Sequence, residues 1–169
     1  MALQTSVDFD FALSAPGVLR GPPVRVNTRV CEVAIQAGLY VVQGTADGQG
    51  KLPTSAAEVA KGLGVAPALA ASDDAFPAGG TADFVYQIGD TVEAVVGQVY
   101  VVVEEAVSAQ DQAYIRHANG NGGLVQKGAF RKSADQVSAA DTATAAPGVR
   151  YLTSASAGGL ALVAINLPQ

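Results

Sequence analysis

Few residues of this chain could carry out chemistry, and they are scattered along it. His117 is the sole histidine, so a hydrolytic triad or a histidine-dependent zinc site would have to use it. It follows a predicted strand and precedes a glycine-rich loop, where we expect an exposed side chain. Cys31 is the sole cysteine, which excludes an intramolecular disulfide and a thiolate metal cluster. Since no activating base lies nearby in the sequence, we expect Cys31 to be a small hydrophobic residue beside a strand.

The acidic residues include two adjacent pairs, Asp73-Asp74 and Glu104-Glu105. A retaining glycosidase needs two carboxyl groups about 5 Å apart across a cleft. Neighbouring residues of a strand point to opposite faces, so we do not expect Glu104 and Glu105 to act together. Asp73 and Asp74 lie in a predicted loop, and the glycine loop at residues 119–123 lacks the Lys-Ser/Thr ending of a phosphate-binding loop. The residues therefore predict no catalytic site, no metal and no cofactor.

Composition excludes further classes of partner. The net charge of −5 repels phosphates, so nucleic acid is not an expected partner. No apolar run approaches the roughly 20 residues that span a bilayer, and the first residues lack the pattern of a signal peptide, so we expect synthesis in the cytoplasm and no membrane partner. Hydrophobic residues make up 49% of the chain but aromatic residues only 6%, which predicts one core built from many small side chains.

Residues 91–105 show how the chain is organised. Before Gly97, the apolar residues fall on even positions, and after it they fall on odd positions. Because a strand has a period of two, such a switch needs an inserted residue or a turn, and glycine permits either. This pattern is typical of an antiparallel sandwich or barrel.

The rest of the chain predicts seven to nine short strands. We expect a mainly β, antiparallel sandwich or barrel of jelly-roll-like form over residues 31–169, preceded by an extended N-terminal arm at 1–30. Pro16-Gly17 and the prolines at 22 and 23 exclude helix in the arm, and we expect residues 8–26 to be unordered in the free protein. The alternative is that the arm forms a strand of its own sheet.

Several local predictions follow the same reasoning. Residues 55–60 favour a helical turn with Thr54 or Ser55 as its cap and Glu58 in a capping box, although a strand is also compatible. Gly89-Asp90 indicates a hairpin between strands at 84–88 and 91 onward. The remaining expectations are a surface loop at 66–81, a strand at 124–130, and a loop or short helix at 134–146.

The order of the motifs resembles the structural cement, or head decoration, proteins of tailed phages. The resemblance covers most of the chain, apart from the loop at 66–81. Its motifs are residues 15–17 (APG), 35–44 (IQAGLYVVQG), 64–66 (GVA), 86–92 (YQIGDTV), 97–101 (GQVYV), 113–116 (AYIR), 128–130 (GAF) and 154–161 (SASAGGLA).

The resemblance implies a protein without enzymatic activity that binds the outer surface of the assembled phage head and staples neighbouring capsomers. Its partner would be the major capsid protein, and it would form a homo-oligomer, a dimer or trimer, in the virion. The alternatives are another virion component, such as a tail-tube or fibre-associated β-domain, and a β-sandwich enzyme or ligand binder. By this reading the capsid-contact candidates lie in the arm: Asp8, Phe9, Phe11, Pro16, Leu19, Arg20, Pro22, Pro23 and Arg25.

Overall fold

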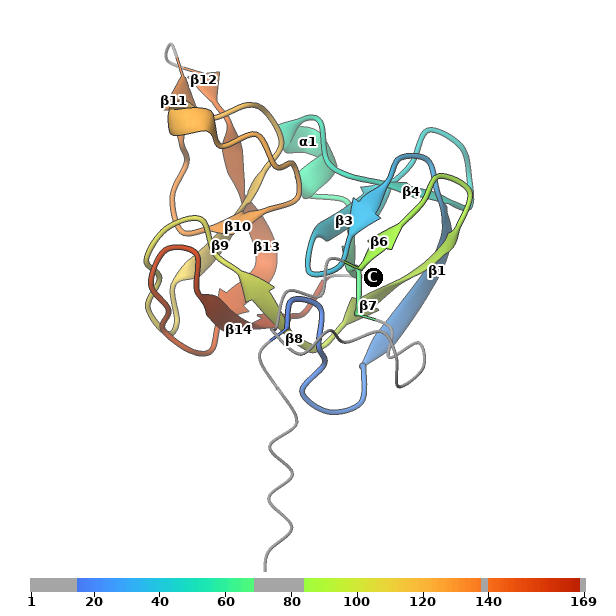
Figure 1. Ribbon diagram of the computed structural model, residues 1–169, viewed down its shortest axis with the longest axis horizontal. Helices are drawn as coiled ribbons and strands as arrows, with labels where there is room; N and C mark the ends of the chain where they lie inside the picture. Colours follow the sequence, from blue (N-terminus) through green and yellow to red (C-terminus); the bar gives the residue numbers. More distant parts are fainter. Residues whose placement is uncertain (1–14, 69–83, 138–139, 168–169) are drawn as a thin grey trace, which may run out of the picture.

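The computed structural model of the protein describes residues 15–68, 84–137 and 140–167. A closed five-stranded barrel and a second five-stranded sheet lie side by side in it (Figure 1). Nearly all strand pairs are antiparallel, so the prediction of a mainly β, antiparallel fold is confirmed. In the part of the chain that the structure describes, helix is confined to two short turns, α1 (Ala56–Val59) and η1 (Asn121–Gly123). Within the described residues, no helix is long and apolar enough to cross a membrane.

The barrel has one parallel pair, which the local pattern did not predict. β1 runs parallel to β4 and meets it only where Val30 pairs with Gln49 and Cys31 with Gly50. Among the described strands, the rest of β1 is paired with β7 alone. The barrel strands, in order around it, are β1 (Arg25–Cys31), β4 (Gln49–Lys51), β3 (Tyr40–Gln43), β5 (Gly62–Val65) and β7 (Thr91–Val96).

The second sheet nearly closes on itself as well. A parallel bridge between Val103 and Phe130 joins the end of one edge strand to the other edge strand. Two small sheets complete the fold, β2 (Ile35–Gln36) with β6 (Val85–Tyr86), and the projecting hairpin β11 (Gln136–Val137) with β12 (Ala140–Asp141) (Figure 1). The second sheet is ordered β10 (Phe130–Arg131), β9 (Gln112–Arg116), β13 (Ala143–Tyr151), β14 (Leu160–Ile165) and β8 (Gln98–Val102).

The chain crosses from the barrel to the second sheet at Gly97. This residue separates β7 from β8 and has a φ of 150°, a backbone conformation that side chains other than glycine rarely adopt. Val92 before it packs inside the barrel, whereas Val99 and Val101 after it pack in the core between the sheets. The switch predicted at this glycine is therefore confirmed, and it is a change of sheet.

The main core lies between the barrel and the second sheet. Tyr40 of the barrel meets Phe130 of the second sheet edge to face, with ring centroids 6.2 Å apart. The buried Tyr40 hydroxyl donates to the carbonyl of Val59 at 3.3 Å, and that of Tyr151 donates to the carbonyl of Arg131 at 2.9 Å. Valine and alanine make up most of the remaining core, as the composition predicted. These two tyrosines tie the small side chains on either side into one interior.

The part of the predicted arm that the structure describes is bonded to the body of the chain. Gly17 donates its N–H to the carbonyl of Tyr100 at 2.7 Å, and Arg20 donates to Gln98 at 2.9 Å, so residues 17–20 extend the edge of β8. From Arg25 the chain is β1, which is the alternative that the sequence left open. The expectation of an unordered arm is therefore wrong from residue 17 onward, because the edge of β8 supplies hydrogen-bond partners; residues 8–14 lie outside the described part.

The helical turn is confirmed, but its cap differs from the prediction. The side chain of Ser55 makes no capping hydrogen bond, while Glu58 Oε2 accepts from the Thr54 backbone N–H at 2.6 Å and from its hydroxyl at 2.9 Å. A strand follows directly at β5, so both compatible structures occur next to each other.

Three local predictions are wrong for tertiary reasons. The turn before Asp90 forms, but β6 pairs with the distant β2 instead of β7. In the stretch at 124–130 only Phe130 is in a strand, because Gly128, with a φ of 81°, turns the chain against Tyr40. The described residues of 134–146 form β11, β12 and the start of β13. The predicted loop at 66–81 lies mostly outside the described residues.

Candidate functional site

Five consecutive exposed residues form a bend at the lower edge of the molecule, between β8 and β1 (Figure 1). The bend runs from Arg20 to Val24, and the Val24 side chain is 82% exposed. The backbone is anchored at both ends, since the N–H of Val24 also bonds to the carbonyl of Val96 at 2.8 Å. Pro22 and Pro23 restrict the chain between the anchors. A stiff, exposed loop with an apolar and a cationic side chain is suited to bind another surface.

Only part of the predicted contact set comes together here. Pro16 packs against Gly38, and Leu19 pairs with Val99 and packs on the main core, so both face the chain's own body. Three predicted residues lie together in the exposed bend: Arg20, Pro22 and Pro23. Three others lie outside the described residues: Asp8, Phe9 and Phe11. The sequence did not single out Val24, whose exposure depends on the position of the bend relative to β7.

The same region is basic in an acidic protein. Residues 15–31 contain three arginines and no carboxylate, although the whole chain carries −5. None of Arg20, Arg25 and Arg29 forms an ion pair with a described carboxylate. Arg29 Nε donates to the side chain of Gln43 at 3.3 Å, and the half-buried Arg25 has an Nε atom without a described partner. This unpaired positive charge favours an anionic partner.

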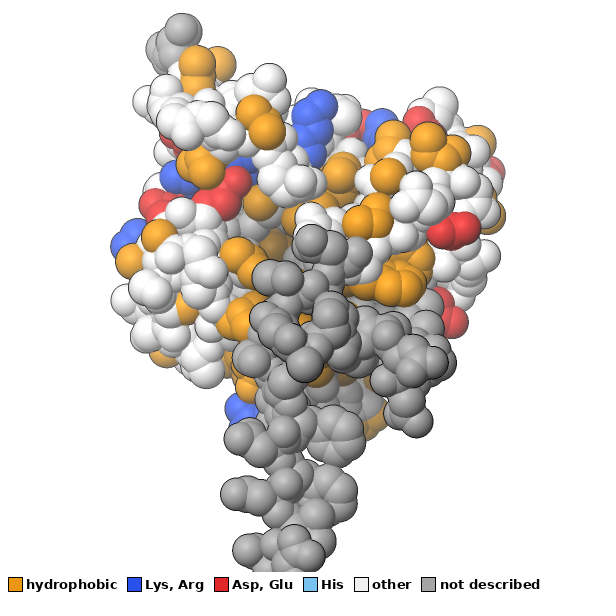
Figure 2. Space-filling view, viewed as in Figure 1, with side chains coloured by type: hydrophobic (Ala, Val, Ile, Leu, Met, Phe, Trp, Pro, Cys, Tyr) orange, Lys and Arg blue, Asp and Glu red, His pale blue; other side chains and the backbone are white. Residues whose placement is uncertain are grey.

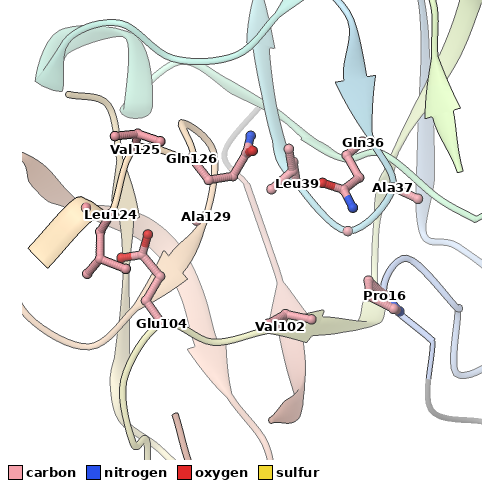
Figure 3. A pocket seen from close by; sticks show the side chains of 12 residues that line it. Pro16, Gln36, Ala37, Leu39, Val102, Glu104, Leu124, Val125, Gln126 and Ala129 are labelled. Atoms are coloured by element: carbon pink, nitrogen blue, oxygen red, sulfur yellow. The ribbon is translucent and has the colours of Figure 1, made fainter. Parts of the chain in front are cut away.

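An apolar groove lies between the two halves of the molecule, with a volume of about 350 Å³. Figure 3 shows Leu124 and Val125 on one wall and Leu39 on the other, with Val102 and Pro16 at its base. Figure 2 shows hydrophobic side chains on the hollow between the halves. The carboxylate that lines the groove, that of Glu104, is already bonded to an arginine. The groove therefore presents packing surface without a free reactive group.

A cluster of paired charges lies beside the groove. Arg116 is fully buried, and its guanidinium donates to both oxygens of Glu104 at 2.7 Å. It also donates to Asp135 at 3.1 Å and to the Thr142 hydroxyl at 2.9 Å. Figure 2 shows acidic and basic side chains side by side below the β11–β12 hairpin. Since Asp135 directly precedes β11, the cluster fixes this hairpin to β9.

Arg131 extends the cluster to both members of the glutamate pair. Its Nη1 donates to Glu104 at 3.3 Å, and its Nε lies 3.2 Å from Glu105 without the geometry of a hydrogen bond. The expectation that Glu104 and Glu105 point to opposite faces is wrong, because β8 ends at Val102 and the strand alternation ends with it. Both carboxylates serve this ion-pair network.

The charges of the cluster are stabilised by their partners. The hydrogen bonds to Glu104 raise the pKa of Arg116. Partial burial alone would raise the pKa of Asp135, but hydrogen bonds from Asn121 and Arg116 bring it below its ordinary value. Partial burial alone would also raise the pKa of Glu105. Hydrogen bonds from Ser133 outweigh this effect, so the pKa of Glu105 is lowered as well. Arg116, Asp135 and Glu105 therefore stay ionised at neutral pH.

We predict that the fold loses stability in acid. A carboxylate whose pKa is lowered by folding stabilises the folded chain at any pH above its pKa in the unfolded state. This stabilisation is lost as the pH falls through its pKa in the folded state. For Glu58, burial is outweighed by hydrogen bonds from Lys51 and Thr54, and its pKa falls from 4.5 to about 2. Urea unfolding between about pH 6 and pH 2 should show the stability falling below about pH 4.5. Glu58→Gln should flatten this dependence, and an unchanged slope would contradict the assignment.

The other reactive side chains are ordinary structural residues. His117 lies directly after β9 and is only 7% exposed, so the prediction of an exposed side chain is wrong. Its Nε2 atom is 3.1 Å from the Thr144 hydroxyl, and burial lowers its pKa. Cys31 is buried in β1, as expected, and burial raises the pKa of its thiol. In the described part of the chain, no three histidine, cysteine or acidic residues are grouped to hold a metal ion.

The fold and the site together define a structural β-protein that acts through its surface. The buried Arg116 is paired with Glu104 and Asp135, and an exposed bend presents Arg20 beside the 82% exposed Val24. The family model of the structural cement protein (E217 gp24/Pam3 gp6) matches residues 3–166. The chain belongs to this family of phage structural cement proteins, whose role is to stabilise the capsid.

A solved structure from a phage capsid has the same fold. The chain is similar to one from the capsid of Myoviridae phage XM1, with a TM-score of 0.62 and 22% identity over 98% of each chain. It also matches the head fiber gp8.5 N base of bacteriophage phi29, with a TM-score of 0.40 and 10% identity over 86% of this chain and 96% of that one. No curated protein matches the chain.

Proposed function

We propose that this cement protein binds the outer surface of the assembled phage head and joins neighbouring capsomers, with the major capsid protein as its partner. The family match over residues 3–166 carries the proposal, because it includes the N-terminal segment as well as both sheets. The protein acts as one β domain with an N-terminal arm, has no catalytic activity, and is made in the host cytoplasm before it joins the virion.

The exposed bend is the described feature best suited to contact the shell. It projects from the body and presents Pro22, Pro23 and Arg20, and Arg20 forms no ion pair with a described carboxylate. Its backbone is held by Gln98 and Val96, so little conformational entropy is lost on binding.

Repetition on the shell compensates for a small contact. A bend of five residues cannot by itself bury the area of a stable interface. A dimer or trimer that engages several equivalent capsomer sites raises the effective affinity without any new contact. The protein therefore functions as a homo-oligomer, and each copy needs only modest affinity for the capsid protein.

Co-sedimentation with shells assembled from the capsid protein of the same genome tests this proposal. We expect saturable binding at a fixed copy ratio. Arg20→Glu combined with Pro22→Asp should weaken binding at least tenfold, since it places carboxylates on the bend. Lys61→Glu is the control, because it reverses an exposed cation outside the bend. Absence of binding to mature shells would refute the proposal, and binding unaffected by the bend variant would refute the bend as the contact.

A further inference from the structure

Among the described strands, most of β1 has no partner on its β4 side. Cys31 donates its N–H to the carbonyl of Asp90, on the β7 side, and Val30 donates to that of Gly48, on the β4 side. Backbone groups alternate in direction along a strand, so the N–H groups of Val26 and Thr28 also point to the β4 side. No described strand pairs with them there, because β4 reaches only Val30 and Cys31. An unpaired edge of this kind is a template for another strand.

The two faces of this edge differ in chemistry. Val26 and Val30 of β1 are 41% and 44% exposed on one face. Arg25 and Arg29 are half-buried on the other face, and neither has a described carboxylate partner. A strand added here would need apolar residues on one side and acidic residues on the other, in strict alternation.

The N-terminal segment of the same chain has this pattern. Residues 7–13 read Val-Asp-Phe-Asp-Phe-Ala-Leu, with large apolar residues at every odd position and both acidic residues at even positions. Residues 1–14 carry two carboxylates and no cation, whereas residues 15–31 carry three arginines and no carboxylate. In a strand pair, residues opposite each other point to the same face. Phe9 and Phe11 would then lie against the valines, while Asp8 and Asp10 face the arginines.

We propose that residues 7–13 of one copy add as a strand to the open edge of β1 in a second copy. Main-chain hydrogen bonds to Val26 and Thr28 give the affinity, and the alternating apolar and charged pairs fix the register. Such an exchange of arms links copies of the protein to one another, and it is independent of shell binding.

The path of the chain favours a second copy over the chain's own edge. Residues 17–20 run antiparallel to β8, so Ala15 lies toward the Val102 end of that strand. β1 begins near Gly97, at the other end of β8, because Arg25 pairs with Val96. An arm bound to its own β1 would first have to turn back along the length of β8. A neighbouring copy can present its edge without that reversal.

Charge reversal in the full-length protein tests the exchange. We expect sedimentation analysis to show concentration-dependent self-association that weakens at high salt. Asp8→Arg/Asp10→Arg should weaken it at least tenfold, and so should Arg25→Glu/Arg29→Glu. Mixing the two variants should restore association, because the reversed arm of one chain then meets the reversed edge of the other. Asp141→Arg reverses an exposed carboxylate of the β11–β12 hairpin, away from β1, and should have no effect on association.

Each contrary result points to a different occupant of the edge. A monomer at all concentrations with amide protection at residues 7–13 would show binding to the chain's own edge and overturn the proposal. The free protein could instead be monomeric, with the arm variant defective only in binding shells. That result would assign the arm to the capsid protein and would also overturn the proposal. Failure of the mixture to associate, with both variants folded by thermal unfolding, would exclude strand exchange while leaving the proposed shell binding intact. The arm variant alters no described residue, so its result does not depend on refolding the barrel.

Discussion

Arg116→Ala is expected to lower the free energy of unfolding by about 3–5 kcal/mol, the typical cost of removing one partner of a buried ion pair. Arg116 is fully buried, and it neutralises Glu104 and Asp135. Without it, both carboxylates remain in a partly buried site with a weakened set of donors. Chemical denaturation at neutral pH measures the change.

The control for this prediction lies on the same sheet. Arg150 of β13 is exposed and makes one long hydrogen bond, at 3.3 Å, to the carbonyl of Gln110. Arg150→Ala should therefore change the stability by no more than about 0.5 kcal/mol. Arg116→Met combined with Glu104→Gln should recover part of the loss, because it removes the uncompensated charge. A loss below about 1 kcal/mol for Arg116→Ala would show that the cluster is solvated rather than structural.

Gly64→Ala is expected to destabilise the barrel by about 3 kcal/mol or more. Gly64 has a φ of 146°, which already disfavours any side chain. In addition, a Cβ atom there would lie 2.4 Å from the carbonyl oxygen of Val95. The contact falls where β5 joins β7 through the pair Val65–Val95, so the clash would separate the two strands that close the barrel.

Gly48→Ala separates the backbone effect from the clash. Gly48 also has a positive φ, 81°, but a Cβ atom there meets nothing within 4 Å. Its substitution should cost only about 1–2 kcal/mol, from the left-handed conformation alone. Thermal or urea unfolding of the two variants gives the comparison. Equal losses of stability in the two variants would show that the close approach of Val95 does not exclude a side chain at position 64.

The features that the sequence predicted well are local. The change of sheet at Gly97 was visible because alternation and a glycine act within one short stretch. The short helix at Ala56–Val59 was visible for the same reason, since its cap residues lie within one turn. The buried Cys31 likewise follows from a residue type that seldom lies at the surface.

The features that it missed depend on contacts between distant segments. β6 pairs with β2, about 50 residues earlier in the chain, and no local pattern records that choice. Arg116 ends an alternating strand, where a charged residue ordinarily indicates the solvent face. Only the fold brings Glu104 and Asp135 to it. The predicted contact residues Pro16 and Leu19 proved to pack inward because β8 has a free edge that residues 17–20 cover.

The central claim is that this protein reinforces the assembled head. The most direct measurement is the temperature at which mature shells of the capsid protein disrupt, with and without saturating cement protein. We predict a higher disruption temperature with the protein bound, and a smaller increase with the Arg20→Glu/Pro22→Asp variant at equal protein concentration. An unchanged disruption temperature on shells that carry a full complement of the protein would contradict the account.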